Sequence, residues 1–149
     1  MNNRSTTMTI LMLLMGLGAA AEIVPLNANW HIQSSAELEH DAPTLASPGL
    51  DVEEWYPARL PTTVLAALVA NNVYPDPYYG LNLTSIPGFR DGRWLRMPDD
   101  SPFRCHWWYR TEFTLPGYES SRHYTLHLDG INYRANVWLN GTQLAGQDT

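Results

Sequence analysis

Several side chains in this sequence could perform acid–base chemistry, and the adjacent carboxylates are the first to weigh. Glu53 directly precedes Glu54, and Asp99 directly precedes Asp100. Two carboxylates that face one substrate can act as a general acid and a general base. Neighbours on an extended chain point in opposite directions, so the glutamates cannot share a substrate. The aspartates lie in a Pro-flanked stretch where aspartate bonds its own backbone. We interpret both pairs as structural.

Two further carboxylates have equally simple interpretations. Glu112 lies on the same strand face as Arg110 and Thr114, which predicts a solvated or cross-strand ion pair. Asp129 directly precedes Gly130 in a turn. The sequence therefore contains no convincing catalytic carboxylate pair.

The histidines and the single cysteine predict neither a metal site nor a nucleophile. His123 and His127 lie four residues apart on a predicted strand, a span of about 13 Å that is too long for two ligands of one zinc ion. Cys105 precedes His106, and adjacent strand residues face opposite ways. We expect no metal and no cofactor. Cys105 is interpreted as a buried thiol or as the partner of a cysteine elsewhere in a longer protein.

The elements that must position these side chains are mostly strands. Within Glu22–Ser35, an alternation of apolar and polar residues from Trp30 predicts a first strand. Asn140-Gly141 between apolar runs is the strongest short signal for a hairpin, here leading into Thr142–Ala145. The other strands predicted by alternation cover Trp107–Leu115, Tyr124–Leu128 and Ala135–Leu139.

One short helix and one long loop precede the last strands. Thr62 is the predicted N-cap of a helix whose apolar residues recur at helical spacing, and Asn71-Asn72 ends it. The region from Ala36 to Pro57 is rich in turns and weakly patterned. Tyr74–His106 is a long aromatic-rich segment, and loops of this length in compact domains are usually functional or disordered.

Composition limits the class of protein. The chain has 149 residues, 44% of them hydrophobic, and a formal net charge of −6. That length suits a single domain, and one cysteine excludes an internal disulfide framework. The acidic balance argues against nucleic acid as a partner. Phe89–Arg96 interleaves arginine with aromatic residues as single-strand binders do, but nearby acids favour a surface loop.

The first 21 residues read as an export signal. Arg4 precedes an apolar stretch from Met8 to Leu17, and Ala19–Ala21 offers a cleavage site with Glu22 as the mature start. The apolar stretch is too short to span a bilayer. We therefore expect residues 1–21 to be a signal peptide, residues 22–149 to be one secreted domain, and no membrane contact after cleavage.

Two glycosylation sequons agree with export. They begin at Asn82 and at Asn140. The second also coincides with the predicted hairpin turn, so modification there requires the turn to stay exposed.

Six stretches along the chain share their order and residue types with one known family. They are Trp30–Ser35, Pro61–Leu68, Tyr74–Gly80, Trp107–Phe113, Leu128–Ala135 and Val137–Gly141, and together they cover most of residues 30–145. In this order they resemble the N-terminal sugar-binding domain of glycoside hydrolase family 2, in its β-mannosidase and exo-β-D-glucosaminidase subgroup.

The resemblance implies an all-β, galactose-binding-domain-like jelly-roll β-sandwich with one short helix. It also implies a downstream (β/α)8 barrel, on which this domain packs and which carries the two glutamates of a retaining glycosidase. About five strands are too few for a sandwich of seven or more. We therefore expect an incomplete domain, the N-terminal non-catalytic portion of a secreted enzyme that hydrolyses β-linked oligosaccharides.

The same resemblance draws attention to the Tyr74–Tyr79 loop. Asp76, Tyr78 and Tyr79 supply flat rings and a carboxylate of the kind that binds sugars, on a loop stiffened by proline. Asn132 and Arg134 are weaker candidates for substrate binding. The loop could instead pack against the barrel as a structural element.

A stand-alone secreted carbohydrate-binding module without catalysis is the alternative function. The sequence leaves open the choice between mannoside and glucosaminide, and between exo and endo action.

Overall fold

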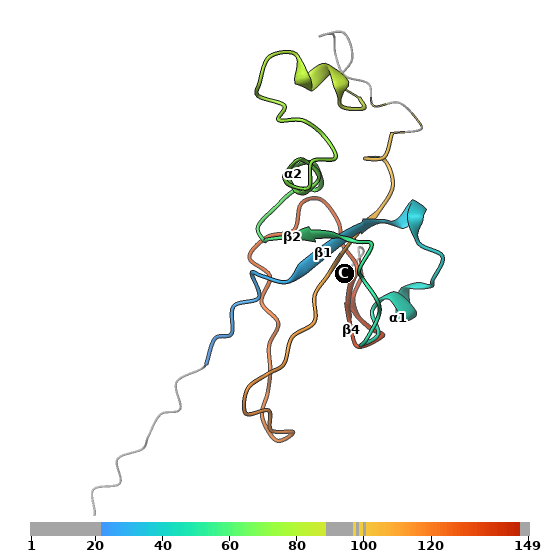
Figure 1. Ribbon diagram of the computed structural model, residues 1–149. Helices are drawn as coiled ribbons and strands as arrows, with labels where there is room; N and C mark the ends of the chain where they lie inside the picture. Colours follow the sequence, from blue (N-terminus) through green and yellow to red (C-terminus); the bar gives the residue numbers. More distant parts are fainter. Residues whose placement is uncertain (1–21, 89–96, 98, 100, 147–149) are drawn as a thin grey trace, which may run out of the picture.

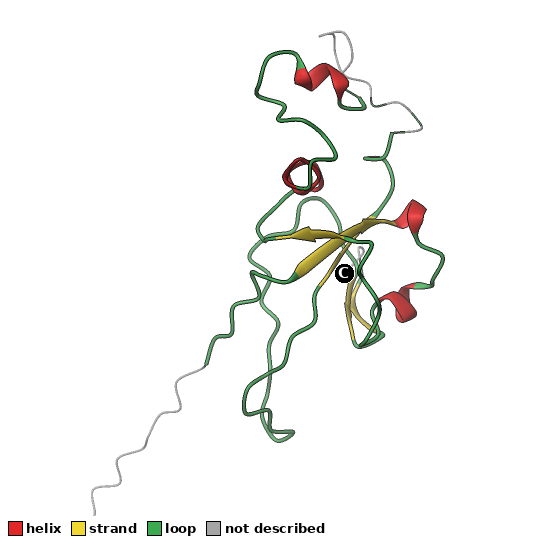
Figure 2. Cartoon of the chain, viewed as in Figure 1, coloured by secondary structure: helices red, strands yellow, loops and turns green. Residues whose placement is uncertain are grey.

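The computed structural model describes residues 22–88, 97, 99 and 101–146, and within them strands and loops predominate (Figure 1, Figure 2). The predicted signal peptide, the whole Phe89–Arg96 stretch, Pro98, Asp100 and residues 147–149 therefore lie outside the described residues. The elements are β1 (Trp30–Ser34), the 3₁₀ helix η1 (Ser35–Glu37), α1 (Ala42–Leu45), β2 (Tyr56–Ala58), α2 (Val64–Ala70), the 3₁₀ helix η2 (Asn82–Ser85), β3 (Trp107–Arg110), β4 (Val137–Leu139) and β5 (Thr142–Ala145).

The larger sheet has three antiparallel strands in the order β2-β1-β3. Its central strand, β1, is the predicted first strand, and its period-two pattern buries Ile32 and Ser34. His31 pairs with Arg110 across one edge, and Trp30 pairs with Ala58 across the other. The sequence did not predict β2, because it has three residues, one of them proline, and forms through pairing with β1.

The smaller sheet is the predicted hairpin of β4 and β5. Asn140 and Gly141 both have positive φ, 49° and 78°, as a two-residue type I′ turn requires. The turn contacts another part of the chain: the Gly141 N–H donates a hydrogen bond to the Ala46 carbonyl at 3.0 Å. The hairpin thus contacts the segment that follows α1.

Both α-helices begin at a side-chain cap. In α2 the Thr63 hydroxyl accepts from the Ala66 N–H at 3.2 Å, so the predicted N-cap at Thr62 was wrong by one residue. The predicted end at Asn71 is confirmed. In α1, which the sequence did not predict, the Asp41 carboxylate accepts from the Thr44 N–H at 3.0 Å. Hydrogen bonding to the Thr44 side chain, followed by this backbone bond, lowers the pKa of Asp41. An oxygen acceptor at this position satisfies an otherwise unpaired backbone donor.

The apolar core is small and lies between β1 and the segments that cover it. Ile32 and Ile86 are completely buried, and Leu68 of α2 and Leu45 of α1 are nearly so. The other buried apolar residues of the described chain are Trp55 and Ala67. A core of this size limits the stability of the isolated chain.

One predicted strand is shorter than expected, and another is not formed. β3 ends at Arg110 rather than at Leu115, and Tyr124–Leu128 belongs to no sheet among the described residues. Residues 111–131, here called the arm, leave β3 and turn back toward β4 (Figure 1). A strand needs a hydrogen-bonded neighbouring strand, and the described part of the chain provides none for Tyr124–Leu128. The alternating apolar residues of the arm therefore stay half exposed.

Candidate functional site

The Tyr74–Gly80 loop is organised by Asp76. The Asp76 carboxylate accepts from the Tyr78 N–H at 2.9 Å, and its backbone carbonyl accepts from the Tyr79 N–H at 3.2 Å. That carbonyl also accepts from the Asn82 side-chain amide at 3.0 Å. Aspartate favours this kind of turn because its side chain can bond the backbone two residues later.

Two tyrosines of this loop are presented to solvent. Tyr78 is 97% exposed and Tyr79 is 77% exposed. Tyr74 anchors the loop instead: its ring lies 5.9 Å from that of Phe103, centroid to centroid, and burial raises the pKa of its hydroxyl. The three candidates Asp76, Tyr78 and Tyr79 therefore lie together on the outer side of one turn. This arrangement can stack on a flat apolar ligand surface and accept hydrogen bonds.

The two weaker candidates lie on a different segment. Asn132 and Arg134 follow the arm, and both are exposed. Between them Tyr133 has a positive φ of 73° and is 87% exposed, and the Arg134 guanidinium lies 5.2 Å from its ring centroid. The structure gives these residues a cation–π contact of their own and does not place them in the Asp76 turn.

The two sequons occupy different surroundings. Asn82 begins η2 and is partly buried, with its side-chain amide bonded to the Asp76 carbonyl. Asn140 lies in the hairpin turn and is exposed. The Asn140 side chain is therefore accessible to solvent, although the backbone of its neighbour Gly141 is bonded to Ala46.

Asp99 and Asp129, two of the carboxylates set aside in the sequence, have side-chain partners, and the backbone of Glu53 has an acceptor. Asp99 forms an ion pair with Arg104. The Asp51 carboxylate accepts from the Glu53 N–H at 2.9 Å. His127 lies 3.5 Å from Asp129, and both are almost fully exposed. The described residues contain no group of three or more His, Cys, Asp or Glu side chains that could hold a metal ion.

Cys105 is a free, half-buried thiol. Its Sγ atom lies 3.1 Å from the Ser34 hydroxyl and donates to the Pro102 carbonyl at 3.1 Å. These contacts agree with the interpretation as a sheltered thiol.

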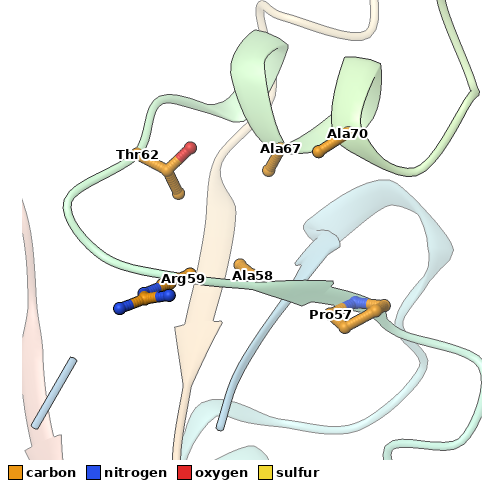
Figure 3. Close-up of a pocket in the computed structure, with 6 residues that line it drawn as sticks. All are labelled: Pro57, Ala58, Arg59, Thr62, Ala67 and Ala70. Atoms are coloured by element: carbon orange, nitrogen blue, oxygen red, sulfur yellow. The ribbon is translucent and has the colours of Figure 1, made fainter. Parts of the chain in front are cut away.

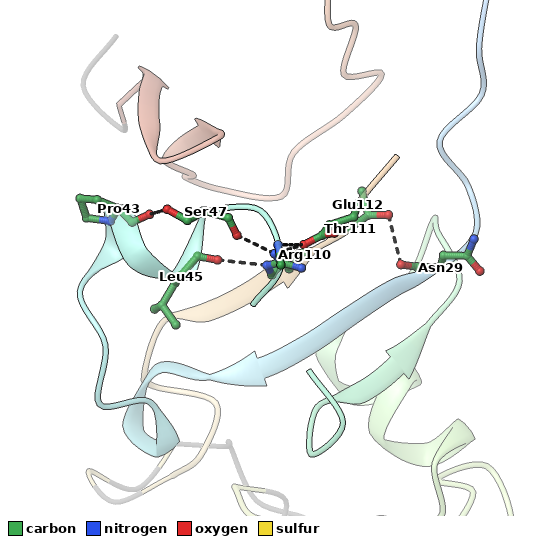
Figure 4. A network of polar contacts seen from close by, with 8 residues as sticks. Asn29, Pro43, Leu45, Ser47, Arg110, Thr111 and Glu112 are labelled. Carbon is green, nitrogen blue, oxygen red and sulfur yellow. Dashed lines mark hydrogen bonds and ion pairs between the residues drawn. The ribbon is translucent and has the colours of Figure 1, made fainter. Parts of the chain in front are cut away.

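Sequence reasoning missed a polar cluster centred on Arg110 (Figure 4). Arg110 is 9% exposed. Its guanidinium donates to the Leu45 carbonyl at 3.1 Å and to the Ser47 carbonyl at 2.8 Å, and it pairs with Glu112. Alternation places Arg110 beside Glu112, but the carbonyls lie more than 60 residues earlier in the chain. An arginine on an otherwise apolar strand was the available signal.

Glu112 completes this cluster. Its Oε1 atom accepts from Arg110 and from the Gly49 N–H, the latter at 2.7 Å. The Arg110 bond, followed by the Gly49 bond, lowers the pKa of Glu112. Glu112 is thus held as a carboxylate. Its ion-pair partner, Arg110, lies two residues before it on the same segment, and not across a sheet as the sequence predicted.

A shallow cavity of about 370 Å³ lies between β2 and α2 (Figure 3). Its floor includes the small side chains of Ala67 and Ala70, and its polar groups come from Arg59 and Thr62. It contains no carboxylate, and so it offers no acid–base pair. Pro57 and Ala58 complete its lining.

Residues 30–149 match the family described as glycosyl hydrolase 2 galactose-binding domain-like. The chain belongs to this family. The match confirms the predicted resemblance, and the mostly-strand architecture with few helices is consistent with the predicted β-sandwich. The domain also contains α1, in addition to the single predicted helix.

Curated relatives of this domain are much longer proteins. An exo-beta-D-glucosaminidase of Amycolatopsis orientalis is 34% identical over 134 residues, which are 90% of this chain but 12% of that protein. A mannosylglycoprotein endo-beta-mannosidase of Lilium longiflorum is 33% identical over 119 residues, 78% of this chain and 12% of that protein. The chain therefore spans a small fraction of the relatives that it matches.

A solved structure gives the same result. The crystal structure of Amycolatopsis orientalis exo-chitosanase CsxA matches with a TM-score of 0.60 and 30% sequence identity, covering 83% of this chain and 13% of that one. The glycoside hydrolase family 2 domain therefore has its fold counterpart within a larger enzyme. Among the described residues, no helix is long and apolar enough to cross a membrane.

Proposed function

We propose that this chain is the N-terminal, non-catalytic portion of a secreted retaining β-glycosidase of the exo-β-D-glucosaminidase or β-mannosidase type. The observation that carries the proposal is the match of 90% of the chain to only 12% of an exo-beta-D-glucosaminidase. Retaining hydrolysis needs two carboxyl groups about 5–5.5 Å apart across the scissile bond. We place that pair in a barrel outside this chain.

Within that enzyme, we assign the Asp76 turn to the wall of the substrate pocket. The solvent-facing rings of Tyr78 and Tyr79 can stack on a pyranose ring, and Asp76 can accept from its hydroxyls. The loop is anchored by Tyr74 against Phe103, so binding costs little additional ordering of the backbone. The substrate class is a β-linked oligosaccharide.

The first experiment identifies the activity. The longer gene product is assayed on an aryl β-glucosaminide and an aryl β-mannoside, and we expect hydrolysis of one of them. A reading frame that stops after Thr149 and a product that binds sugars without hydrolysing them would contradict the proposal in favour of a carbohydrate-binding module.

A second experiment tests the role of the turn. In the longer enzyme, Tyr78→Ala should raise KM about tenfold with a smaller effect on kcat, because it removes binding to an unreacting part of the substrate. Tyr118→Ala is the matched control, since Tyr118 is also an exposed tyrosine, 65% exposed, but lies on the arm. If the two substitutions change KM equally, Tyr78 does not line the substrate pocket.

Export and glycosylation belong to the same proposal. If residues 1–21 are the signal peptide, N-terminal sequencing should show that the secreted product begins at Glu22. In a eukaryotic host, Asn140→Gln should remove one glycan, because Asn140 is exposed. Asn82→Gln tests the other sequon, in which the Asn82 side-chain amide donates a hydrogen bond to the Asp76 carbonyl.

A further inference from the structure

The Asn140-Gly141 turn brings together two residues that make a peptide chain chemically labile. Asparagine is one of the thermolabile residues, and no other asparagine in the sequence precedes a glycine. The Asn140 side chain is exposed. Because glycine has no side chain, its amide nitrogen can approach the Cγ atom of the preceding asparagine closely. The turn therefore holds an electrophile and a nucleophile on adjacent residues.

The reaction that such a pair supports is deamidation through a cyclic imide. The backbone nitrogen of Gly141 gives its proton to hydroxide and attacks Cγ of Asn140. A bond forms between these two atoms, the bond from Cγ to Nδ2 breaks, and Nδ2 takes a proton from water and leaves as ammonia. Water then opens the imide at one of its two carbonyls, which leaves aspartate or isoaspartate. The sum is asparagine and water giving an acid and ammonia.

The folded chain holds the nucleophile of this reaction in another contact. The Gly141 N–H donates to the Ala46 carbonyl at 3.0 Å. A Cβ at Gly141 would lie 3.1 Å from the Ser47 hydroxyl, which is itself fixed by a bond of 2.8 Å to the Pro43 carbonyl (Figure 4). The nitrogen must leave this close contact before it can lose its proton and turn toward Cγ. Attack on Asn140 therefore needs the hairpin to separate from residues 43–47.

We propose that Asn140 is a deamidation site which the fold protects through the hydrogen bond from Gly141 to Ala46. The reaction proceeds only in those molecules whose hairpin has separated from residues 43–47. The proposal concerns the chemistry of this turn and does not depend on the proposed glycosidase.

The isoaspartate product would make the separation permanent. Isoaspartate passes the main chain through the former side chain and so adds one methylene group to the backbone. The two-residue turn joins Leu139 to its register partner Thr142, and a longer backbone cannot close it in the same way. Either product also ends the sequon, because position 140 is then no longer asparagine.

The test compares two Asn-Gly pairs in one molecule. Asp129→Asn introduces the second pair on the arm, where Gly130 is exposed and a Cβ would meet nothing within 4 Å. The Asp129 side chain is 96% exposed, so this substitution should leave the fold unchanged. The sequence contexts match, because each pair follows a leucine and precedes a β-branched residue.

The Asp129→Asn chain is produced in a host that adds no glycans and is incubated at mildly alkaline pH. Peptide mapping by mass spectrometry then gives the fraction of aspartate and isoaspartate at each position over time. We expect Asn140 to react at least about fivefold more slowly than position 129, as protection by one backbone hydrogen bond predicts. In concentrated urea the two positions should react at equal rates.

Two results would overturn the proposal. Equal rates at the two positions in the folded chain would show that the contact with Ala46 gives no protection. An Asn140 that stays intact in urea while position 129 reacts would show that the turn is not a deamidation site.

A second pair of variants changes the protection itself. Arg110 holds the carbonyls of Leu45 and Ser47, so Arg110→Met should loosen this segment and speed the reaction at Asn140. Arg122→Met, which breaks an exposed ion pair on the arm, is the matched control and should leave the rate unchanged.

Hydrogen exchange of the Gly141 amide, followed by NMR in the same samples, should rise by the same factor as the deamidation rate, because both need the same local opening. Faster exchange at Gly141 with an unchanged rate at Asn140 would contradict the proposal. The comparison within Asp129→Asn does not require Arg110→Met to fold.

Discussion

At the scale of single residues, Arg110 should be among the most costly side chains of this domain to remove. Arg110→Met leaves the carbonyls of Leu45 and Ser47 without their charged donor. Charged hydrogen bonds contribute about 1.5–3 kcal/mol each, so we expect a loss of about 2–3 kcal/mol in the free energy of unfolding. Urea denaturation followed by circular dichroism measures it.

The matched control is Arg122→Met, which breaks the exposed pair with Glu119. Exposed ion pairs contribute at most about 1 kcal/mol. If the two substitutions shift the urea midpoint equally, the Arg110 cluster does not stabilise the fold as its geometry indicates.

Glu112 should make stability depend on pH in the acid range. Its pKa in the folded chain lies below the ordinary value of 4.5, so the folded state favours the carboxylate. The resulting stability is present above about pH 4.5 and is lost as the pH falls through the lowered folded pKa. Glu112→Gln should therefore be less stable than the unsubstituted chain at pH 7, and the difference should shrink on acidification. Urea midpoints between pH 7 and pH 3 test this, and parallel curves would contradict it.

Part of the candidate site could be predicted from the residue types alone. The composition of the Asp76 turn predicts a cluster of rings and a carboxylate, because the residues are close in sequence. The Arg110 cluster could not be predicted in full, because its carbonyl acceptors come from a loop that only tertiary folding brings to β3. Local spacing carries no information about such a contact.

At the scale of elements, the start of α2 can be assigned by substitution. Thr63→Ala removes the hydroxyl that accepts from Ala66 and should cost about 1 kcal/mol. Thr62→Ala is the matched control, since Thr62 donates to the Thr63 carbonyl and caps nothing. If Thr62→Ala lowers the thermal stability more than Thr63→Ala does, the N-cap is Thr62, as the sequence predicts.

The seating of the hairpin gives a second test at this scale. A Cβ at Gly141 would lie 3.1 Å from the Ser47 hydroxyl and 3.3 Å from the Pro43 carbonyl. At Gly117, which also has a positive φ, a Cβ would meet nothing within 4 Å. Both alanine variants are strained by φ, but Gly141→Ala should lose about 1 kcal/mol more because of the contacts. Equal urea midpoints for Gly141→Ala and Gly117→Ala would show that the hairpin turn does not pack against Ser47 and Pro43.

Which elements could be predicted depends on where their stability comes from. The β1 strand, α2 and the Asn140-Gly141 hairpin follow from local patterns, and all three are confirmed. The β2 strand forms through pairing with β1, and α1 has four residues, too few for its own sequence to specify. Residues 111–115 and 124–128 have the strand pattern but pair with no strand in the part of the chain that the structure describes, so pattern and structure differ there.

At the scale of the whole molecule, the arm should govern how the chain behaves in solution. Five of its apolar residues are between 42% and 48% exposed: Phe113, Tyr124, Leu126, Leu128 and Ile131. Exposed apolar rows without strand partners promote association. We expect the 149-residue chain to associate with rising concentration in sedimentation velocity, and Leu126→Glu to reduce that association.

Leu83→Glu is the control, since Leu83 is 40% exposed but lies in η2. A monodisperse monomer at high concentration would contradict this prediction. In the longer enzyme proposed above, we expect the same row to be covered, and its amides to exchange with deuterium more slowly than in the isolated chain.

The segment 45–47, at the end of α1, is held by hydrogen bonds from distant residues, and this has a consequence for the order of folding. Its carbonyls at Leu45 and Ser47 are held by Arg110, and that of Ala46 is held by Gly141. All of these partners are translated much later than the segment itself. On the ribosome, the first third of the chain therefore emerges before its own stabilising contacts exist, and this corner of the domain is completed only when the hairpin has been synthesised.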